Sequence, residues 1–405
     1  MNRPRQYHRP MARGTAKNVL SGTMEATPAI DPRTGVPVVS VTPHPAPMAG
    51  VPAPLESEPS AEQMALTRRL IQPRTILSIL IPFAIIVAFV SLNSAQLSKV
   101  PSLILAANPA LVLAAFLVFY AGFPLRGKRW STLLEGTGEH VSTKDSTHII
   151  FLSWLVNCVV PAKLGDVYRA YLLKINSTAS LSRTFGTVFI ERVLDLFAIA
   201  ILGLAAGYWS FRSGLPPAIQ IVFGIGVVVV VVLAFALFTM RNFGRRIIVA
   251  LPLPHQVLDL YDRFEEGVFG ALVARHLPKL GFLTGLIWMT EGLRLFLVIQ
   301  ALGFEDVSLG LSGAVFVALI GSLLTAVPLS PAGLGIVEAG VVGVLHVAYG
   351  VPLPEATAIA LLDRVISVFS IIVFGSIAYM LSPLPRGLGH LGTRADATSA
   401  ASTPA

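Results

Sequence analysis

The sequence has few charged residues and a single cysteine, and each scarcity excludes a class of protein. Only 13% of its 405 residues are Asp, Glu, Lys or Arg, whereas soluble domains carry about a quarter. Cys158 has no second cysteine to pair with, which excludes an internal disulfide and a cysteine-based metal cluster. The eight histidines include no pair at H-x-x-x-H spacing. We therefore expect no metal site and no cofactor.

Apolar sequence is abundant instead. Hydrophobic residues make up 54% of the chain, and a helix needs about 20 of them to cross a bilayer core of about 30 Å. The net charge of +8 fits Lys and Arg gathered in cytoplasmic loops, so we expect no nucleic-acid partner. The composition predicts an all-α polytopic membrane protein. Six runs can span fully: about 75–92, 103–123, 184–209, 218–240, 280–302 and 357–381.

The two ends of the chain differ from this apolar middle. Residues 1–66 are rich in proline and have no apolar period, which predicts a disordered cytoplasmic tail. Residues 67–382 form the expected transmembrane domain, and 383–405 a flexible C-terminal tail.

Two further apolar segments, 147–160 and 311–349, are interrupted by proline or glycine. Short apolar runs of this kind are typical of re-entrant half-helices. The basic loops are all cytoplasmic only if 147–160 returns to the side it entered. We therefore predict six spans plus two re-entrant pairs, in the plasma membrane with both termini cytoplasmic. A simpler alternative lets 311–349 cross twice, giving eight spans.

The interrupted segments also resemble each other. Pro161-Ala-Lys-Leu-Gly165 aligns with Pro331-Ala-Gly-Leu-Gly335, and Glu191-Arg192-Val193 aligns with Asp363-Arg364-Val365. The proline-to-arginine separation is 31 residues in the first copy and 33 in the second. Three expected spans lie between the copies, and an odd number makes the repeat inverted. We predict repeat units at about 70–209 and 215–381, an arrangement that recurs in transporters.

The same motifs carry a family resemblance. The run Asn157-Cys-Val-Val-Pro161 to Ala170, followed by Glu191-Arg192 and by Pro328 to Glu338, resembles the lysylphosphatidylglycerol synthase transmembrane-region family. This family is also called the flippase-like domain family. The resemblance implies translocation of lipids, including aminoacylated phosphatidylglycerol, and some similar proteins are linked to polyprenyl-linked sugar transfer. The chain ends soon after its last expected span, so we expect no aminoacyl-transferase domain and no enzymatic activity.

Charged residues inside the apolar segments are the candidate site. Each costs about 2.5–3.5 kcal/mol at a helix centre unless it pairs or faces water. We expect buried pairs among Glu191, Asp195, Glu291, Arg294 and Asp363, with Glu291 and Arg294 pairing locally. The candidate lipid-headgroup residues are Lys163, Asp166, Arg169, Arg192, Glu338 and Arg364. The alternative is that the arginine–acid pairs only join the spans to the re-entrant segments.

The re-entrant motifs have a chemistry of their own. Proline suits the first turn of a helix, so each motif is expected to open a half-helix whose N-terminal amides favour an anion such as phosphate. The motif residues are Pro161, Gly165, Pro331, Gly333 and Gly335. These features favour translocation of an anionic, aminoacylated or polyprenyl-linked lipid. The alternatives are a membrane component of a polyprenyl-phosphate-dependent transferase, with Asp166 or Glu338 as base, and a non-catalytic accessory of a separate lipid synthase.

Overall fold

The computed structural model describes residues 97–160, 164–211, 217–251, 254–305, 307, 309–325 and 330–386. All of them belong to one compact unit, Ser57–Ala405. The predicted tail 1–66, the first predicted span 75–92, the motif residues Pro161 and Lys163, and positions 387–405 lie outside the described residues.

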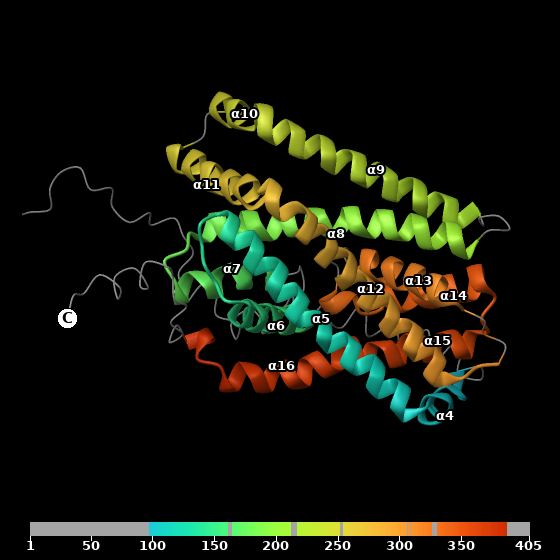
Figure 1. The fold of residues 1–405 in the computed structure, drawn as a ribbon. Helices are drawn as coiled ribbons and strands as arrows, with labels where there is room; N and C mark the ends of the chain where they lie inside the picture. The colour runs from blue at the N-terminus through green and yellow to red at the C-terminus, as the bar shows by residue number, and fades with distance from the viewer. Residues whose placement is uncertain are drawn as a thin grey trace, which may run out of the picture. The chain divides into compact units, whose positions relative to one another are not determined.

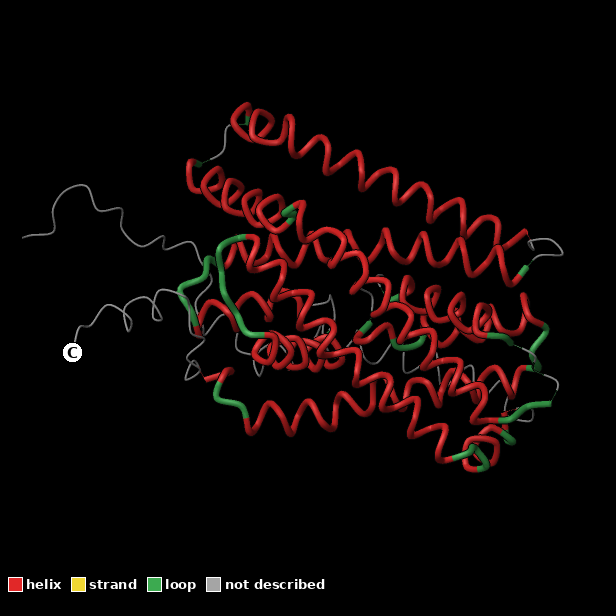
Figure 2. Tube along the Cα trace, viewed as in Figure 1, coloured by secondary structure: helices red, strands yellow, loops and turns green. Residues whose placement is uncertain are grey.

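The described residues form helices and no strands (Figures 1 and 2). This agrees with the predicted all-α fold. In chain order the principal helices are α4 (Val100–Leu105), α5 (Pro109–Gly136), α6 (Thr143–Val159), α7 (Leu164–Asn176), α8 (Leu181–Ser210), α9 (Pro217–Thr239), α10 (Arg245–Ala250), α11 (His255–Ala271), α12 (Leu277–Leu302), α13 (Leu311–Leu324), α14 (Ile336–Tyr349), α15 (Leu353–Arg364) and α16 (Ser370–Leu381). Short π-helical turns, η1 (Met240–Gly244) and η4 (Val365–Phe369), join α9 to α10 and α15 to α16, and the 3-10 turn η3 (Pro331–Gly333) precedes α14.

Local sequence explains where the helices of the first half begin. The Asn108 side chain accepts hydrogen bonds from the amides of Ala110 and Leu111, and Pro109 occupies the first helical position of α5. The Ser142 hydroxyl accepts from the amide of Asp145 at the start of α6. Both caps pair backbone N–H groups that the helix itself leaves without partners.

Within the described residues, five helical segments are long and apolar enough to cross a membrane: Pro109–Gly136, Gly226–Gly244, Ala274–Leu302, Pro331–Tyr349 and Leu353–Leu381. The large apolar side chains of α9 that face outward, among them Val231, Phe235 and Phe238, are exposed as in a helix that contacts lipid. The chain is therefore a multi-pass helical membrane protein.

One of these five segments is broken. Ala332 has φ 51°, Gly333 has φ 71° and Gly335 has φ 84°, backbone angles in the left-handed region that glycine adopts without steric cost. The continuous helix α14 is only 14 residues long, about 21 Å at 1.5 Å per residue, which is shorter than a bilayer core of about 30 Å. This geometry supports the predicted re-entrant pair, and the total of six spans remains a prediction.

Figure 1 shows how the two hairpins lie in the fold. The pair α6–α7 begins and ends near the end of the molecule where α8 starts, and the pair α13–α14 begins and ends near the opposite end, where α15 starts. Helix α5 runs opposite to α12, and α8 runs opposite to the α15–α16 segment. These directions are those expected of inverted halves.

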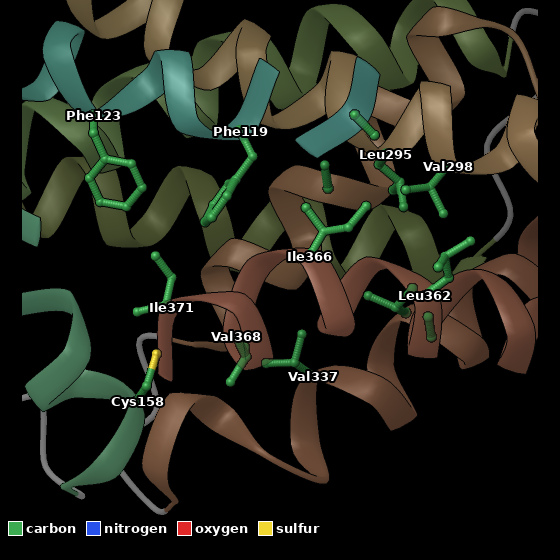
Figure 3. Close-up of a cluster of buried hydrophobic side chains, with 14 of the residues drawn as sticks. Phe119, Phe123, Cys158, Leu295, Val298, Val337, Leu362, Ile366, Val368 and Ile371 are labelled. Carbon is green, nitrogen blue, oxygen red and sulfur yellow. The ribbon is translucent and has the colours of Figure 1, made fainter. Parts of the chain in front are cut away.

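The main apolar core joins both halves of the chain. Phe119 and Phe123 of α5 pack in the same buried cluster as Leu295 of α12, Val337 of α14 and Ile366 of η4 (Figure 3). Because lipid is as apolar as these side chains, close packing rather than water exclusion holds such helices together.

Candidate functional site

A cavity of about 410 Å³ lies inside the helix bundle, within the usual size of small-ligand sites. Its wall is formed by α5, α6, α7, α8, α12, α13, α14 and α15, together with the η3 and η4 turns. Both halves of the predicted repeat therefore contribute to it. The charged lining residues are Arg126, Arg129, Asp166, Glu191, Arg192, Asp195, Glu291, Arg294, Asp363 and Arg364.

On the side of the first motif, Arg192 is held on all three guanidinium nitrogens. Its Nε and Nη2 donate to the two carboxylate oxygens of Asp166, at 3.0 and 2.9 Å, and its Nη1 donates to Asp195 Oδ2 at 3.3 Å. A two-bond arginine–carboxylate contact of this kind fixes orientation as well as charge. Asp166 lies in the first turn of α7, so this contact joins the half-helix to α8.

Glu191, the neighbour of Arg192, faces two other arginines. Arg129 Nη2 lies 2.9 Å from Glu191 Oε1, and Arg169 Nη2 lies 3.1 Å from Glu191 Oε2. Arg129 also donates to Asp195. Arg169, a predicted headgroup residue, is 1% exposed and stacks 4.7 Å from the Trp130 ring centre. Arg169 is not among the residues that line the cavity, and its ion pair holds Glu191, which is one of them.

The second motif repeats this plan with other residues. Glu338, in the first turn of α14, forms an ion pair with Arg364, whose Nε lies 3.0 Å from Glu338 Oε1. Glu338 Oε2 accepts a hydrogen bond from the Gly335 amide at 2.6 Å. Asp363, the neighbour of Arg364, accepts two hydrogen bonds from Arg294: Nε donates to Oδ1 at 2.8 Å and Nη2 donates to Oδ2 at 3.1 Å. In both halves, the arginine of the repeated acid–arginine motif pairs with an acid in the first turn of the preceding half-helix. The acid of the motif pairs with an arginine of another helix.

Arg126 and Glu291 connect the two halves. Arg126 of α5 pairs with Glu291 of α12, and Glu291 also contacts Arg294, as the spacing of that pair predicts. Arg126 and Arg129 are not among the site residues predicted from the sequence, because the predicted span ends at 123 and the charges after it are typical of a loop. The pattern Arg126-Gly-x-Arg129, matched by Glu291-Gly-x-Arg294, was a signal that would have found them.

Together these twelve side chains, here termed the ion-pair cluster, hold equal numbers of positive and negative charges. The members are Arg126, Arg129, Arg169, Arg192, Arg294 and Arg364 with Asp166, Glu191, Asp195, Glu291, Glu338 and Asp363. Mutual pairing is what permits this many charges at low exposure, because an unpaired charge in a low-dielectric interior is costly.

The predicted anion sites at the half-helix N-termini are partly occupied by the protein itself. The Gly165 amide donates to Asn157 Oδ1 at 2.9 Å, and the Gly335 amide donates to Glu338 Oε2. A side chain at Gly165 would overlap the Ser153 carbonyl oxygen, so this glycine allows α6 and α7 to pack closely. Of the five motif residues, Gly333 lines the cavity, whereas Gly165, Pro331 and Gly335 shape the backbone around it.

Several membrane proteins are similar in sequence to this chain. A UPF0104 membrane protein of Methanocaldococcus jannaschii is 37% identical over 227 residues, which cover 56% of this chain and 93% of that protein. A UPF0104 membrane protein of Methanothermobacter thermautotrophicus is 25% identical over 299 residues, covering 69% of this chain and 86% of the relative.

A third relative is a glycosyltransferase by name. Glycosyltransferase AglD of Haloferax volcanii is 28% identical over 319 residues, covering 70% of this chain but only 51% of AglD. The chain thus corresponds to about half of that protein. Residues 75–390 match the profile described as the lysylphosphatidylglycerol synthase TM region. The chain belongs to the lysylphosphatidylglycerol synthase TM region family.

Proposed function

We propose that this protein translocates an anionic or aminoacylated lipid across the cytoplasmic membrane, with the headgroup passing through the cavity and the acyl chains staying in the bilayer. The observation that carries the proposal is the charged cavity, lined by residues of both re-entrant motifs. A lipid headgroup crossing hydrocarbon needs polar partners along its path, since an unsolvated charge there is costly.

The matched contacts of the two halves support two gates. Asp166–Arg192 and Glu338–Arg364 join each half-helix to the long helix that follows it. Under the proposed inverted repeat, units of about 70–209 and 215–381 place these contacts toward opposite membrane faces. Alternating opening of two related gates is the usual mechanism of transporters built from inverted repeats. Both termini would then be cytoplasmic.

A second candidate function rests on the similarity to AglD, which is named a glycosyltransferase. In that case the chain would be a membrane component of a group transfer that uses a polyprenyl-phosphate lipid, working with a separate transferase or synthase. Asp166 and Glu338 would then act as base, but both are bonded to arginines. Each carboxylate would have to leave its arginine to reach a substrate, and breaking a buried pair from one side is costly, so the first proposal is preferred.

Reconstitution of the purified chain in phospholipid vesicles tests the proposal. Fluorescent phosphatidylglycerol and lysylated phosphatidylglycerol should move between leaflets faster than in empty vesicles. Ser322→Trp, which places a large ring at the cavity wall, should abolish the movement, whereas Leu311→Trp at an exposed position on the same helix should not. Lipids that stay on their original leaflet across several headgroups would contradict the proposal, and group transfer by isolated membranes given donor and acceptor would favour the second candidate.

A further inference from the structure

The carboxylates that line the cavity are all paired with arginines. Each of the five has both oxygens within 3.3 Å of a guanidinium nitrogen: Asp166, Glu191, Asp195, Glu291 and Asp363. An ammonium group entering the cavity would have to displace an arginine to reach one of them. Since arginine binds carboxylates in a two-pronged geometry that an amine cannot match, this exchange is unfavourable.

Among the described residues of the ion-pair cluster, the groups without a hydrogen-bond partner are donors with one exception. The exception is Glu191 Oε2, which makes no hydrogen bond but lies 3.1 Å from Arg169 Nη2. Arg126 Nη1 and Arg364 Nη2 are buried without a hydrogen-bond partner, and both side chains line the cavity. Arg126 is only 5% exposed. Arg129 Nε, Arg169 Nε and Arg169 Nη2 also lack a hydrogen-bond partner, but each residue is 1% exposed and packed among its ion-pair partners. A buried donor without a partner costs free energy that a ligand oxygen would recover.

Helix α6 brings the two arginines to the same part of the cavity. The Arg126 guanidinium lies 4.8 Å from the Trp154 ring centre. Cys158 lies one turn further along α6, in the same buried cluster as Val368, which follows Arg364 by four residues (Figure 3). Trp154, Cys158 and Val368 all line the cavity. Positions four apart share one face of a helix and are about 6 Å apart along its axis. A lipid headgroup that fills the cavity would therefore meet both side chains, which belong to its wall.

We infer that Arg126 and Arg364 together bind a phosphate group, and that the cavity selects lipids by their phosphate and not by an amine. This inference rests on the proposed function and narrows it: an anionic phospholipid or polyprenyl phosphate is the substrate, and an aminoacyl group attached to the lipid adds no affinity. A phosphodiester offers two unesterified oxygens, one for each guanidinium, and arginine is well suited to both.

Arg192 differs from Arg364 in having no guanidinium nitrogen left for a ligand. All three of its guanidinium nitrogens donate to Asp166 or Asp195, whereas Arg364 uses Nε for Glu338 and leaves Nη2 unpaired. The two arginines occupy matching places in the sequence repeat. The structure thus assigns the phosphate contact to the second copy, and assigns to Arg192 the positioning of Asp166 on α7.

Ligand binding to the purified full chain in neutral detergent tests the inference, with the ligand-dependent shift of the thermal unfolding midpoint as the readout. The probes are dihexanoyl phosphatidylglycerol, its lysylated form, dihexanoylglycerol without phosphate, and inorganic phosphate. We expect the first two to bind with Kd values within about threefold of each other, and dihexanoylglycerol not to bind. Inorganic phosphate should compete weakly, because it fits the arginines without the acyl contacts.

Conservative variants identify the residues. Arg126→Lys and Arg364→Lys keep the charge but lose the planar fork, and each should weaken phosphatidylglycerol binding by about tenfold or more. The matched control is Arg183→Lys. Arg183 lies on α8, away from the cavity, and forms an exposed ion pair with Glu266. Because the two tested arginines lie on different helices, either variant carries the test alone if the other fails to fold.

Several results would overturn the inference. Lysylated lipid that binds about tenfold more tightly than phosphatidylglycerol would show recognition of the amine. Equal binding of dihexanoylglycerol, or wild-type affinity in both folded lysine variants, would remove the phosphate site. Inorganic phosphate that binds as tightly as the lipid would make the site one for the free ion. Phosphate-dependent binding without any lipid movement in vesicles would contradict the proposed translocation and leave the binding site intact.

Discussion

Arg126 of α5 and Glu291 of α12 form a buried ion pair, and each is followed by a glycine and, two positions later, by an arginine. The two arginines, Arg129 and Arg294, both bind the acid of the repeated acid–arginine motif, Glu191 in one half and Asp363 in the other. Residues in matching places thus contact each other or make matching contacts. This relationship supports an inverted repeat that extends beyond the two motifs predicted from the sequence.

The matching glycines give the first prediction. A Cβ at Gly127 would overlap Thr147 Oγ1 and come within 2.9 Å of the Thr143 carbonyl oxygen on α6, and a Cβ at Gly292 would come within 2.9 Å of Val315 Cα on α13. Gly127→Ala and Gly292→Ala should each lower the free energy of unfolding by about 1–3 kcal/mol, because the helices are forced apart. The unfolding midpoint in detergent measures this.

Gly285→Ala is the matched control on α12, since nothing lies within 4 Å of the position that its Cβ would take. Its unfolding midpoint should stay unchanged or rise slightly, because alanine favours helix more than glycine does. Equal midpoints for all three alanine variants would argue against the close packing of α5 on α6 and of α12 on α13.

Features of the structure that depend on residues close together in the chain could be predicted from the sequence. Apolar runs and helix-breaking residues are local, and they located the helices at 184–209, 218–240, 280–302 and 357–381 and the break at Pro331. The local contacts Arg192–Asp195 and Glu291–Arg294, three residues apart, are also present. Both kinds of feature depend on positions close together in the chain.

Ion pairs between residues far apart in the sequence could not be predicted in this way. Arg126 and Arg129 follow an apolar run with Lys128 beside them, a pattern typical of a cytoplasmic loop. In the structure α5 continues to Gly136, because acids of α8 and α12 neutralise these arginines in place of water. Only the fold brings those acids within reach, so charge counting along the chain ended the helix too early.

Neutralising one buried carboxylate of the ion-pair cluster should destabilise the protein, because the arginines that it pairs with keep their charge. Glu191→Gln leaves Arg129 and Arg169 without their shared partner, and both are 1% exposed. We expect a loss of about 3–5 kcal/mol in the free energy of unfolding, the usual cost of breaking a buried pair from one side. Glu266→Gln, which breaks an exposed pair with Arg183, should cost less than about 1 kcal/mol. Similar losses for the two variants would mean that the buried charges are solvated.

Single cysteines in a Cys158→Ala background can establish the topology. Asn176, the last residue of α7, is unsuitable for labelling because it is buried and its amide donates to the Leu172 and Leu384 carbonyl oxygens. Thr178, which is exposed, replaces it. A membrane-impermeant maleimide added to whole cells should leave position 178 unlabelled, because the loop is expected on the cytoplasmic side.

Positions that are expected on the outer side of the membrane are labelled for comparison with position 178. Ser102, Glu305 and Pro352 are exposed in the structure, and cysteines there should react with the external reagent. Labelling of position 178 from outside would overturn the first re-entrant pair. Protection of position 352 would contradict both the inverted arrangement and the eight-span alternative, since each places that loop outside.

The last prediction concerns Arg192 and Arg364, which we expect to be matched in place but different in effect. Arg192→Lys cannot keep all three donor contacts to Asp166 and Asp195, so α7 loses its fixed position. Movement of lipid from the cytoplasmic leaflet should slow, with less effect in the other direction. Arg364→Lys should slow movement from the outer leaflet, because Glu338 and the α14 half-helix lie on that side under the inverted arrangement.

Lysine is the informative replacement at both positions because it retains the charge. Alanine would leave a carboxylate unpaired, at a cost of about 3–5 kcal/mol, and loss of transport could then reflect misfolding. Transport is measured in vesicles of known orientation, in both directions, after the unfolding midpoint of each variant has been matched to the wild type. Wild-type rates in both directions from two stable lysine variants would make Asp166–Arg192 and Glu338–Arg364 structural pairs, and the two-gate mechanism would lose its main support.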